Sequence, residues 1–220
     1  IGRIADIHHL LPDSGLHIVG EHFLPIRHQL LGLKNATLDG VTEVYSQAPA
    51  LAQCRTILKK FKSHNWYDTA GSAKHVAETG DVKLAAIAST LAGEIYGLKV
   101  LAADVEDEHH NATRFLIMSR DAELPPNEGK VVTTFVFRVK NAPAALYKAI
   151  GCFATANINI TKLESYQLGG SFNATQFYAD IQGHTADPAV ARALEELRFY
   201  TAKLDILGVY PAHPYREDMP

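Results

Sequence analysis

The sequence predicts an α/β protein in two parts: a sheet with many parallel strand pairs, and then a ferredoxin-like βαββαβ unit. In the first part, short apolar runs of strand length alternate with segments of helical periodicity, which is typical of α/β sheets. Residues 121–129 combine prolines, a glycine and acids without periodicity, so we expect a linker there. Beyond it, strand and helix patterns follow in the order β-α-β-β-α-β.

The composition is that of a globular protein. Of the 220 residues, 47% are hydrophobic and 20% are charged, and the net charge is −3 with a pI near 6.4. Without a basic excess, we expect no nucleic-acid partner. No apolar stretch reaches the length of a membrane span, so we expect no membrane partner. The two cysteines cannot form a disulfide framework, which favours a reducing compartment and hence a cytoplasmic location.

The first part opens with extended segments. Residues 16–20 and 23–33 and the run Val41–Tyr45 are expected to be extended, and residues 49–61 to form one helix, because apolar side chains recur at helical spacing. Asp68-Thr69 come just before a second helix, and a glycine follows it. The remaining elements, in chain order, are that helix at 70–78, ended by Gly80; a strand at 84–88; a short helix capped by Ser89 or Thr90 and ended by Gly97; and a strand at 99–102.

The second part has one-sided elements. Its first strand, Val131–Val139, alternates apolar and more polar side chains, and its helices, at 144–156 and from Pro188, carry apolar residues at i, i+4 and i+7. The other three strands are expected at 158–166, 177–181 and around 204–206. The even-numbered side of the first strand (Val132, Thr134, Val136) is too apolar for a solvent face, so we expect it to pair two copies of the chain.

No familiar cofactor or metal motif is present. The sequence has no Gly-x-Gly-x-x-Gly, no phosphate-binding Gly-x-x-x-x-Gly-Lys and no Cys-x-x-Cys. The pairs His8-His9 and His109-His110 are adjacent, and adjacent side chains point apart, so they are poor joint ligands. The run 106–110 (Glu-Asp-Glu-His-His) suits a solvated acidic turn better than a metal site. We therefore expect neither a cofactor nor a metal.

Polar residues stand where strands and helices meet. Ser46 follows a strand, Gln53 lies one turn into the next helix, and Thr69 stands where a helix begins. Ligands of α/β sheets bind at such ends, and helix N-termini favour anions, so these side chains could surround a carboxylate. The alternative, favoured on spacing alone, is that Ser46 and Thr69 are only helix caps. Separately, Thr113 beside Arg114 could donate a proton and hold an acidic substrate, although this pair alone is a weak signal.

An ordered series of motifs resembles prephenate dehydratases of the bacterial type with a C-terminal ACT regulatory domain. The resemblance covers nearly the whole chain and is far more specific than any one motif. Its catalytic part is carried by Val-Tyr-Ser-Gln-Ala-Pro-Ala-Leu-Ala-Gln-Cys (44–54), Asp-Thr-Ala-Gly-Ser-Ala (68–73), Ala-Ala-Ile-Ala-Ser (85–89), Tyr-Gly-Leu (96–98), Val-Glu-Asp (105–107) and Asn-Ala-Thr-Arg-Phe (111–115). Its ACT part is carried by Asn-Ala-Pro-Ala-Ala-Leu (141–146), Asn-Ile-Asn-Ile-Thr-Lys-Leu-Glu-Ser (157–165) and Leu-Gly-Val-Tyr-Pro (207–211).

The resemblance implies a domain organisation. It implies a bilobed, periplasmic-binding-protein-like catalytic domain over residues 1–120, the linker at 121–129 and an ACT domain over 130–212. The chain begins at Ile1, without a Met or a signal peptide, and the family's first stretch, with its Glu-Asn-Ser motif, has no counterpart here. We therefore expect the chain to be a fragment in which the first lobe is incomplete. The family also implies a homodimer or homotetramer.

The resemblance also implies a function. The family are lyases (hydro-lyases) that convert prephenate to phenylpyruvate, with loss of carbon dioxide and water, for L-phenylalanine synthesis. They need no cofactor, and L-phenylalanine regulates them allosterically through the ACT domain. The alternatives are an arogenate dehydratase, whose substrate differs by an amino group, or a bilobed amino-acid-sensing protein that binds without turnover. No residue decides between prephenate and arogenate.

The resemblance assigns roles residue by residue. Thr113 is expected to be the catalytic threonine, with Arg114 and Phe115 positioning and packing around it. The substrate contacts expected are Ser46, Gln53, Thr69 and Ala70. The effector contacts expected are Asn141, Ala144, Ala145 and Leu146, facing Glu164 and Ser165 of a neighbouring subunit. The chain departs from the family pattern at Gln47, where a His is usual, at Ala144, where a Gly is usual, and at Tyr166-Gln167, where Arg-Pro is usual.

Overall fold

The structure is a computed structural model that describes residues 10–108, 111–140, 142–167 and 175–217. By their internal contacts the residues divide into two compact units. The first unit is Leu24–Thr113, and the second combines Gly2–Phe23 with Arg114–Pro220. In the part that is described, no helix is long and apolar enough to cross a membrane.

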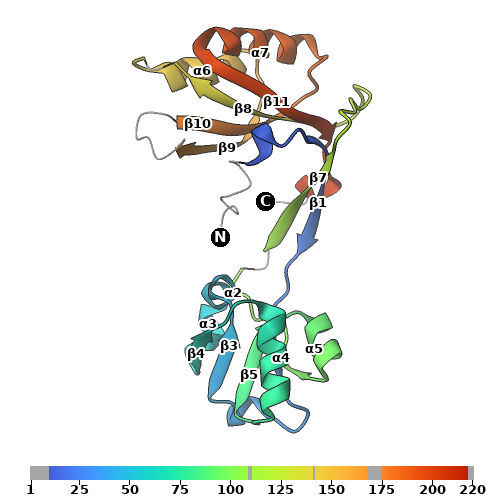
Figure 1. The fold of residues 1–220 in the computed structure, drawn as a ribbon, viewed down its shortest axis with the longest axis vertical. Coiled ribbons are helices and arrows are strands. Elements are labelled where there is room, and N and C mark those ends of the chain that lie inside the picture. The colour runs from blue at the N-terminus through green and yellow to red at the C-terminus, as the bar shows by residue number, and fades with distance from the viewer. Residues whose placement is uncertain (1–9, 109–110, 141, 168–174, 218–220) are drawn as a thin grey trace. The chain divides into compact units, whose positions relative to one another are not determined.

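The first unit is built on a mixed five-stranded sheet in the order β4-β3-β5-β2-β6 (Figure 1). β3 runs parallel to β4 and β5, whereas β2 is antiparallel to β5 and β6, so the predicted parallel pairs make up half of the sheet. The strands are β2 (Gln29–Gly32), β3 (Glu43–Ser46), β4 (Lys62–Asn65), β5 (Leu84–Ala88) and β6 (Lys99–Ala102). The helices are η2 (Leu38–Gly40), α2 (Ala48–Gln53), α3 (Arg55–Leu58), α4 (Thr69–Thr79) and α5 (Thr90–Tyr96).

The predicted start and stop residues act as helix ends. The Asp68 carboxylate accepts the backbone N–H of Gly71 at the start of α4, and Gly80 ends that helix at φ 71°. Ser89 caps α5 through the N–H of Ala92. These caps satisfy backbone groups that a helix end leaves unpaired. β5 lies between them and is buried at all its residues, as its apolar run predicted.

The single helix predicted over residues 49–61 is wrong. The chain breaks at Cys54 (φ −122°, ψ 33°), and α3 starts anew at Arg55. The cause is a distant carboxylate, because Asp107 accepts the backbone N–H groups of Arg55 and Thr56 at 2.8 and 3.0 Å. A second helix start is therefore built by tertiary contact, which local periodicity does not reveal. The sequence interpretation also missed β4, whose four residues are polar.

The second unit has a six-stranded sheet in the order β7-β1-β11-β8-β10-β9. Its last four strands and two helices follow the predicted βαββαβ order, with antiparallel pairing throughout those four strands. The elements are η1 (Leu11–Asp13), β1 (His17–Pro25), β7 (Ala112–Ser119), β8 (Val131–Val139), α6 (Ala145–Thr155), β9 (Ile160–Gln167), β10 (Thr175–Gln182), α7 (Pro188–Tyr200), β11 (Thr201–Pro211) and η3 (Pro214–Arg216).

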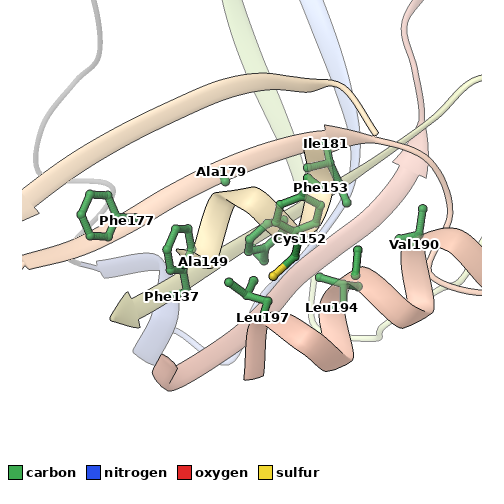
Figure 2. Close-up of a cluster of buried hydrophobic side chains, with 12 residues drawn as sticks. Phe137, Ala149, Cys152, Phe153, Phe177, Ala179, Ile181, Val190, Leu194 and Leu197 are labelled. Carbon is green, nitrogen blue, oxygen red and sulfur yellow. The ribbon is translucent and has the colours of Figure 1, made fainter. Parts of the chain in front are cut away.

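Both helices cover one face of this sheet (Figure 1). Figure 2 shows the core between these helices and the sheet, which includes the buried Cys152, Phe153 and Leu197. The ring centroids of Phe137 and Phe177 in this core lie 5.2 Å apart. Alternate residues of β8 point into this layer, which is why the strand shows a period of two.

The other face of the sheet is not open as expected. Val132, Thr134 and Val136 are at most 1% exposed, because Leu11 of η1 and Ile18 of β1 belong to the same buried cluster. β1 and β7, which lie outside the predicted ferredoxin-like unit, extend its sheet beside β11. The apolar side of β8 is therefore covered within this chain, and it gives no reason by itself to expect a dimer.

Ala144 stands just before α6 in a left-handed conformation, with φ 58° and ψ 19°. A side chain is strained there, which is the physical reason for a glycine at this position. We expect Ala144→Gly to stabilise the protein by about 0.5 to 1 kcal/mol, since glycine adopts this conformation without the clash of a Cβ. Urea unfolding of both proteins measures the change, and a lower free energy of unfolding for the variant would contradict it.

Candidate functional site

Thr113 and its neighbours lie on β7. The side chains of Thr113 and Phe115 are exposed, the latter at 50%, whereas Arg114 between them is largely buried. Alternate residues of a strand point to opposite faces, so Thr113 and Phe115 share the face away from Arg114. The catalytic residues expected from the sequence are thus divided between two faces of one strand.

The guanidinium of Arg114 is held by three groups of the second unit. Its Nε donates to Glu21 Oε2 at 2.6 Å, its Nη1 to Asp180 Oδ2 at 2.5 Å, and its Nη2 to the Tyr210 hydroxyl at 2.6 Å. Both carboxylates have no exposed side-chain surface. Every nitrogen of the guanidinium therefore has a protein partner, whereas the sequence interpretation offered Arg114 to a substrate carboxylate.

The same carboxylates have further partners. Arg216 donates to Glu21 through Nε at 2.6 Å and Nη2 at 2.9 Å, and it lies 3.7 Å from Asp180. The backbone N–H of His213 donates to Glu21, and the Thr134 hydroxyl donates to Asp180 Oδ1 at 2.6 Å. Two arginines thus face two carboxylates, which compensates the desolvation of all four charges.

The network changes the protonation of its members. Burial raises the pKa of Glu21, but the hydrogen bonds from Arg216 and from His213 and the charges of both arginines outweigh it, so the pKa is lowered overall. Desolvation, followed by the charge of Asp180, raises the pKa of Tyr210. The tyrosine therefore stays protonated, which keeps its hydroxyl able to take part in the network.

Acid is expected to weaken the fold through Glu21. Because its folded pKa is lowered, its stabilisation is complete above the unfolded value of about 4.3 and is lost as the pH falls through the folded pKa. We expect Glu21→Gln to lower Tm most at pH 7, and the difference from wild type to shrink between about pH 5 and pH 3. Thermal melts across that range measure it, and a difference that does not vary with pH would contradict the linkage.

A polar cluster in the first unit contains Gln53. Its side-chain amide exchanges two hydrogen bonds with the Asn111 amide, at 3.2 and 3.0 Å. His28 Nε2 lies 2.9 Å from Gln53 Oε1, and since that oxygen only accepts, the imidazole donates. Gln53 and Asn111 also line a surface hollow together with Arg55, Lys59 and residues 106–108. The hollow thus joins two motifs that the sequence placed 58 residues apart.

The buried carboxylate of Glu106 holds the backbone of His28, and so this cluster, in place. The backbone N–H of His28 donates to Glu106 Oε2 at 2.9 Å, and Arg27 Nη1 donates to Oε1 at 3.0 Å. Burial raises the pKa of Glu106, but the hydrogen bonds from His28, from its own N–H and from Arg27 lower it overall. The sequence interpretation missed His28, which stands alone between motifs.

The other expected substrate residues lie apart from this hollow. Ser46 is fully buried and donates its hydroxyl to the Ile87 carbonyl at 2.7 Å, so it joins β3 to β5 and caps no helix. Thr69 is the first residue of α4, and Asp68 is the cap. The alternative that Ser46 and Thr69 are both helix caps is therefore wrong. Ala70 is exposed in the first turn of the same helix.

The expected effector residues lie on two elements of the second unit. Ala144 precedes α6, where Ala145 is the first residue and Leu146 packs against the helical core. Glu164 and Ser165 lie on β9, opposite Tyr178 and Phe177 of β10. Asn141 falls outside the described residues.

Thiols and metal ligands offer little reactive chemistry. Desolvation raises the pKa of Cys54 to about 12 and that of Cys152 to about 11, so neither thiol is a ready nucleophile. Within the described ranges, no three His, Cys, Asp or Glu side chains gather as metal ligands. The expected pairs at 8–9 and 109–110 lie outside those ranges.

Known proteins place this geometry in one family. A sequence model of prephenate dehydratase matches residues 1–123. A "bifunctional N-acyl-homoserine lactone acylase/prephenate dehydratase" of Komagataeibacter europaeus is 50% identical over 98% of the chain, which spans 78% of that protein. The chain spans 58% of an Arabidopsis thaliana arogenate dehydratase/prephenate dehydratase, a chloroplastic protein that is 36% identical over 96% of the chain.

A solved structure agrees. The prephenate dehydratase of Arthrobacter aurescens, in complex with L-Phe, superposes with a TM-score of 0.81 at 30% identity, covering 93% of this chain and 68% of that one. Mixed-sheet α/β architecture, the family model and a relative of 50% identity agree, and the chain belongs to the prephenate dehydratase family.

Proposed function

We propose that this protein converts prephenate to phenylpyruvate with release of carbon dioxide and water. The observation that carries the proposal is the family match over residues 1–123, which includes Thr113 and the polar cluster around Gln53 and Asn111. The relatives are named as dehydratases of prephenate, of arogenate or of both.

The reaction needs one proton donor from the protein, because the electrons released by decarboxylation stay in the substrate ring. As the carboxylate leaves as carbon dioxide, its bonding electrons move into the ring, and the ring hydroxyl departs with a proton to form water. Thr113, exposed on β7, is assigned to donate that proton. A threonine hydroxyl is a weak acid, so its orientation toward the leaving hydroxyl must carry most of the rate effect.

The hollow lined by Gln53 and by Asn111, which stands two residues before Thr113, suits substrate handling. The amides of Gln53 and Asn111 each keep a second N–H beyond their mutual pair, and the hollow beside them also carries the cations Arg55 and Lys59. Such donors match carboxylate oxygens. We assign Ser46 to holding β3 and β5 together behind this region, because its hydroxyl is already donated.

Assays with two substrates decide the reaction. Prephenate should give phenylpyruvate, followed by its absorbance, and arogenate should give phenylalanine, followed by amino-acid analysis. Turnover of prephenate alone, of arogenate alone or of both identifies the dehydratase and its substrate. Saturable binding without turnover would instead support the amino-acid-sensing protein.

We propose that residues 130–212 form an ACT domain and that residues 1–120 belong to a bilobed catalytic domain. The βαββαβ order of β8 to β11 supports the first assignment, and the L-Phe complex of the Arthrobacter aurescens relative supports its ligand. Binding of L-phenylalanine would regulate catalysis only if it favoured one catalytic state over another. We propose a homodimer or homotetramer, to be measured by light scattering, and a cytoplasmic location.

L-phenylalanine binding tests the regulatory assignment. We expect one site per chain by isothermal titration, and Ala144→Gly should bind equally or more tightly, because Ala144 carries a methyl group at a left-handed position where the family has glycine. No heat of binding with millimolar phenylalanine would contradict the assignment and leave the domain a structural role.

A second activity has one observation in its favour. The relative at 50% identity is named an N-acyl-homoserine lactone acylase as well as a dehydratase. Cys54 and Cys152 are buried and their pKa values are raised, so neither thiol is a ready nucleophile for this reaction. Incubation with an N-acyl-homoserine lactone and detection of the freed fatty acid tests this activity directly.

A further inference from the structure

We propose that Asp180 and Glu21 are positioning residues for Thr113, acting through Arg114. This inference rests on the proposed function of Thr113, but it concerns residues of the second unit that the expected catalytic motifs do not include. The Arg114 guanidinium donates hydrogen bonds to two buried carboxylates, that of Asp180 on β10 and that of Glu21 on β1.

The hydrogen bonds of Arg114 to these two carboxylates fix the rotation of β7 about its axis. Arg114 reaches Asp180 and Glu21 at 2.5 and 2.6 Å, so its position along the strand and the rotation of the strand are both set. Thr113 is the preceding residue and points to the opposite face, so a rotation of the β7 backbone at Arg114 would also reorient the Thr113 side chain. Charge-assisted hydrogen bonds are the strong kind, and here three of them converge on one planar group.

The carboxylates are themselves held in place. Thr134 donates to Asp180 at 2.6 Å and lies 2.6 Å from the Tyr210 hydroxyl, which accepts from Arg114. Asp180 is therefore fixed by the central strand β8 and does not follow Arg114 passively. Because both carboxylates are fully buried, solvent cannot replace them as partners of the guanidinium.

The network also joins β7, at Arg114, to β10 within the second unit. Asp180 belongs to β10, whose neighbour β9 carries Glu164 and Ser165, the expected effector contacts. Asp180 pairs with Lys162 of β9, two residues before Glu164. A change in the register or tilt of β9 and β10 would therefore displace Asp180 and, with it, Arg114 of β7.

A pair of neighbouring variants tests the proposal. Asp180→Asn removes a charge from the network. Ile181→Ala removes apolar volume from the opposite face of β10, in the hydrophobic core between the sheet and the helices α6 and α7. Both should lower Tm. In assays with prephenate at a temperature well below the Tm of both variants, we expect Asp180→Asn to lower kcat at least about 10-fold and to keep KM within about twofold of wild type. Ile181→Ala should leave kcat and KM nearly unchanged.

Tyr210→Phe is a milder variant in case Asp180→Asn does not fold. It removes one hydrogen bond to Arg114 without changing the charge, and we expect kcat to fall about threefold with KM unchanged. An unchanged kcat in Tyr210→Phe and Asp180→Asn, or an equal loss in Ile181→Ala, would overturn the positioning role.

Hydrogen exchange separates this proposal from the proposed function. The amides of β7 should exchange faster in Asp180→Asn than in wild type or Ile181→Ala, whether or not the protein turns over prephenate. Equal β7 exchange in all three proteins would overturn the positioning role even in an active enzyme. If the wild-type protein did not turn over prephenate, but β7 still exchanged faster in Asp180→Asn than in the other two proteins, only the dehydratase assignment would be rejected.

Discussion

Thr113→Ala is expected to lower kcat at least about 100-fold for prephenate while the protein keeps its fold. This is the usual scale for removing one general acid. Thr113 is exposed on β7, so losing its hydroxyl leaves no buried group unpaired, and Tm should change little. Steady-state kinetics and a thermal melt of the same sample measure both effects.

Thr113→Val makes the test sharper, because valine keeps the shape of threonine and lacks the proton. A matched control is Ser119→Ala, which removes a hydroxyl from the last residue of the same strand, where it accepts the N–H of Asp121. The control should keep wild-type kcat. Wild-type kcat in both Thr113 variants would remove this residue from the mechanism, and a loss in Ser119→Ala would point to a general weakening of β7.

Much of the fold follows from local sequence patterns. The caps at Asp68 and Ser89 and the buried run of β5 depend on neighbours in the chain, and the structure has them as predicted, whereas β8 is a strand as predicted but is buried on both faces. The break at Cys54 depends on Asp107, more than 50 residues later in the chain. Local patterns do not carry such a contact.

The candidate site shows the same limit more strongly. Motif order predicted Thr113 and Gln53 as site residues, but the partners of Arg114 lie 66 to 96 residues away in sequence. Glu21 and Asp180 are buried acids, and a buried acid is costly without a cation. Because other polar residues share β1 and β10 with these acids, the sequence does not mark either acid as buried or as the partner of a base.

Gly208→Ala is expected to destabilise the protein by about 3 kcal/mol or more, at or beyond the upper end for overpacking. Gly208 lies in the Leu-Gly-Val-Tyr-Pro motif of β11, opposite Ile18 of the parallel strand β1. A methyl group there would lie 2.0 Å from the Ile18 carbonyl oxygen and 2.7 Å from its Cβ. The backbone atoms of Ile18 cannot rotate away from this methyl group as a side chain could, so β1 must move away from β11.

That movement would reach the charged network, because β1 carries Glu21, which binds both Arg114 and Arg216. Urea unfolding should therefore show a lower midpoint for Gly208→Ala, and β1 amides should lose protection against hydrogen exchange. Gly151→Ala is the matched control, since Gly151 lies within α6 with no atom near a new Cβ. Alanine there should stabilise by about 0.5 to 1 kcal/mol. If Gly208→Ala unfolded at the wild-type midpoint, the close pairing of β1 with β11 would be wrong, and with it the route by which Glu21 reaches Arg114.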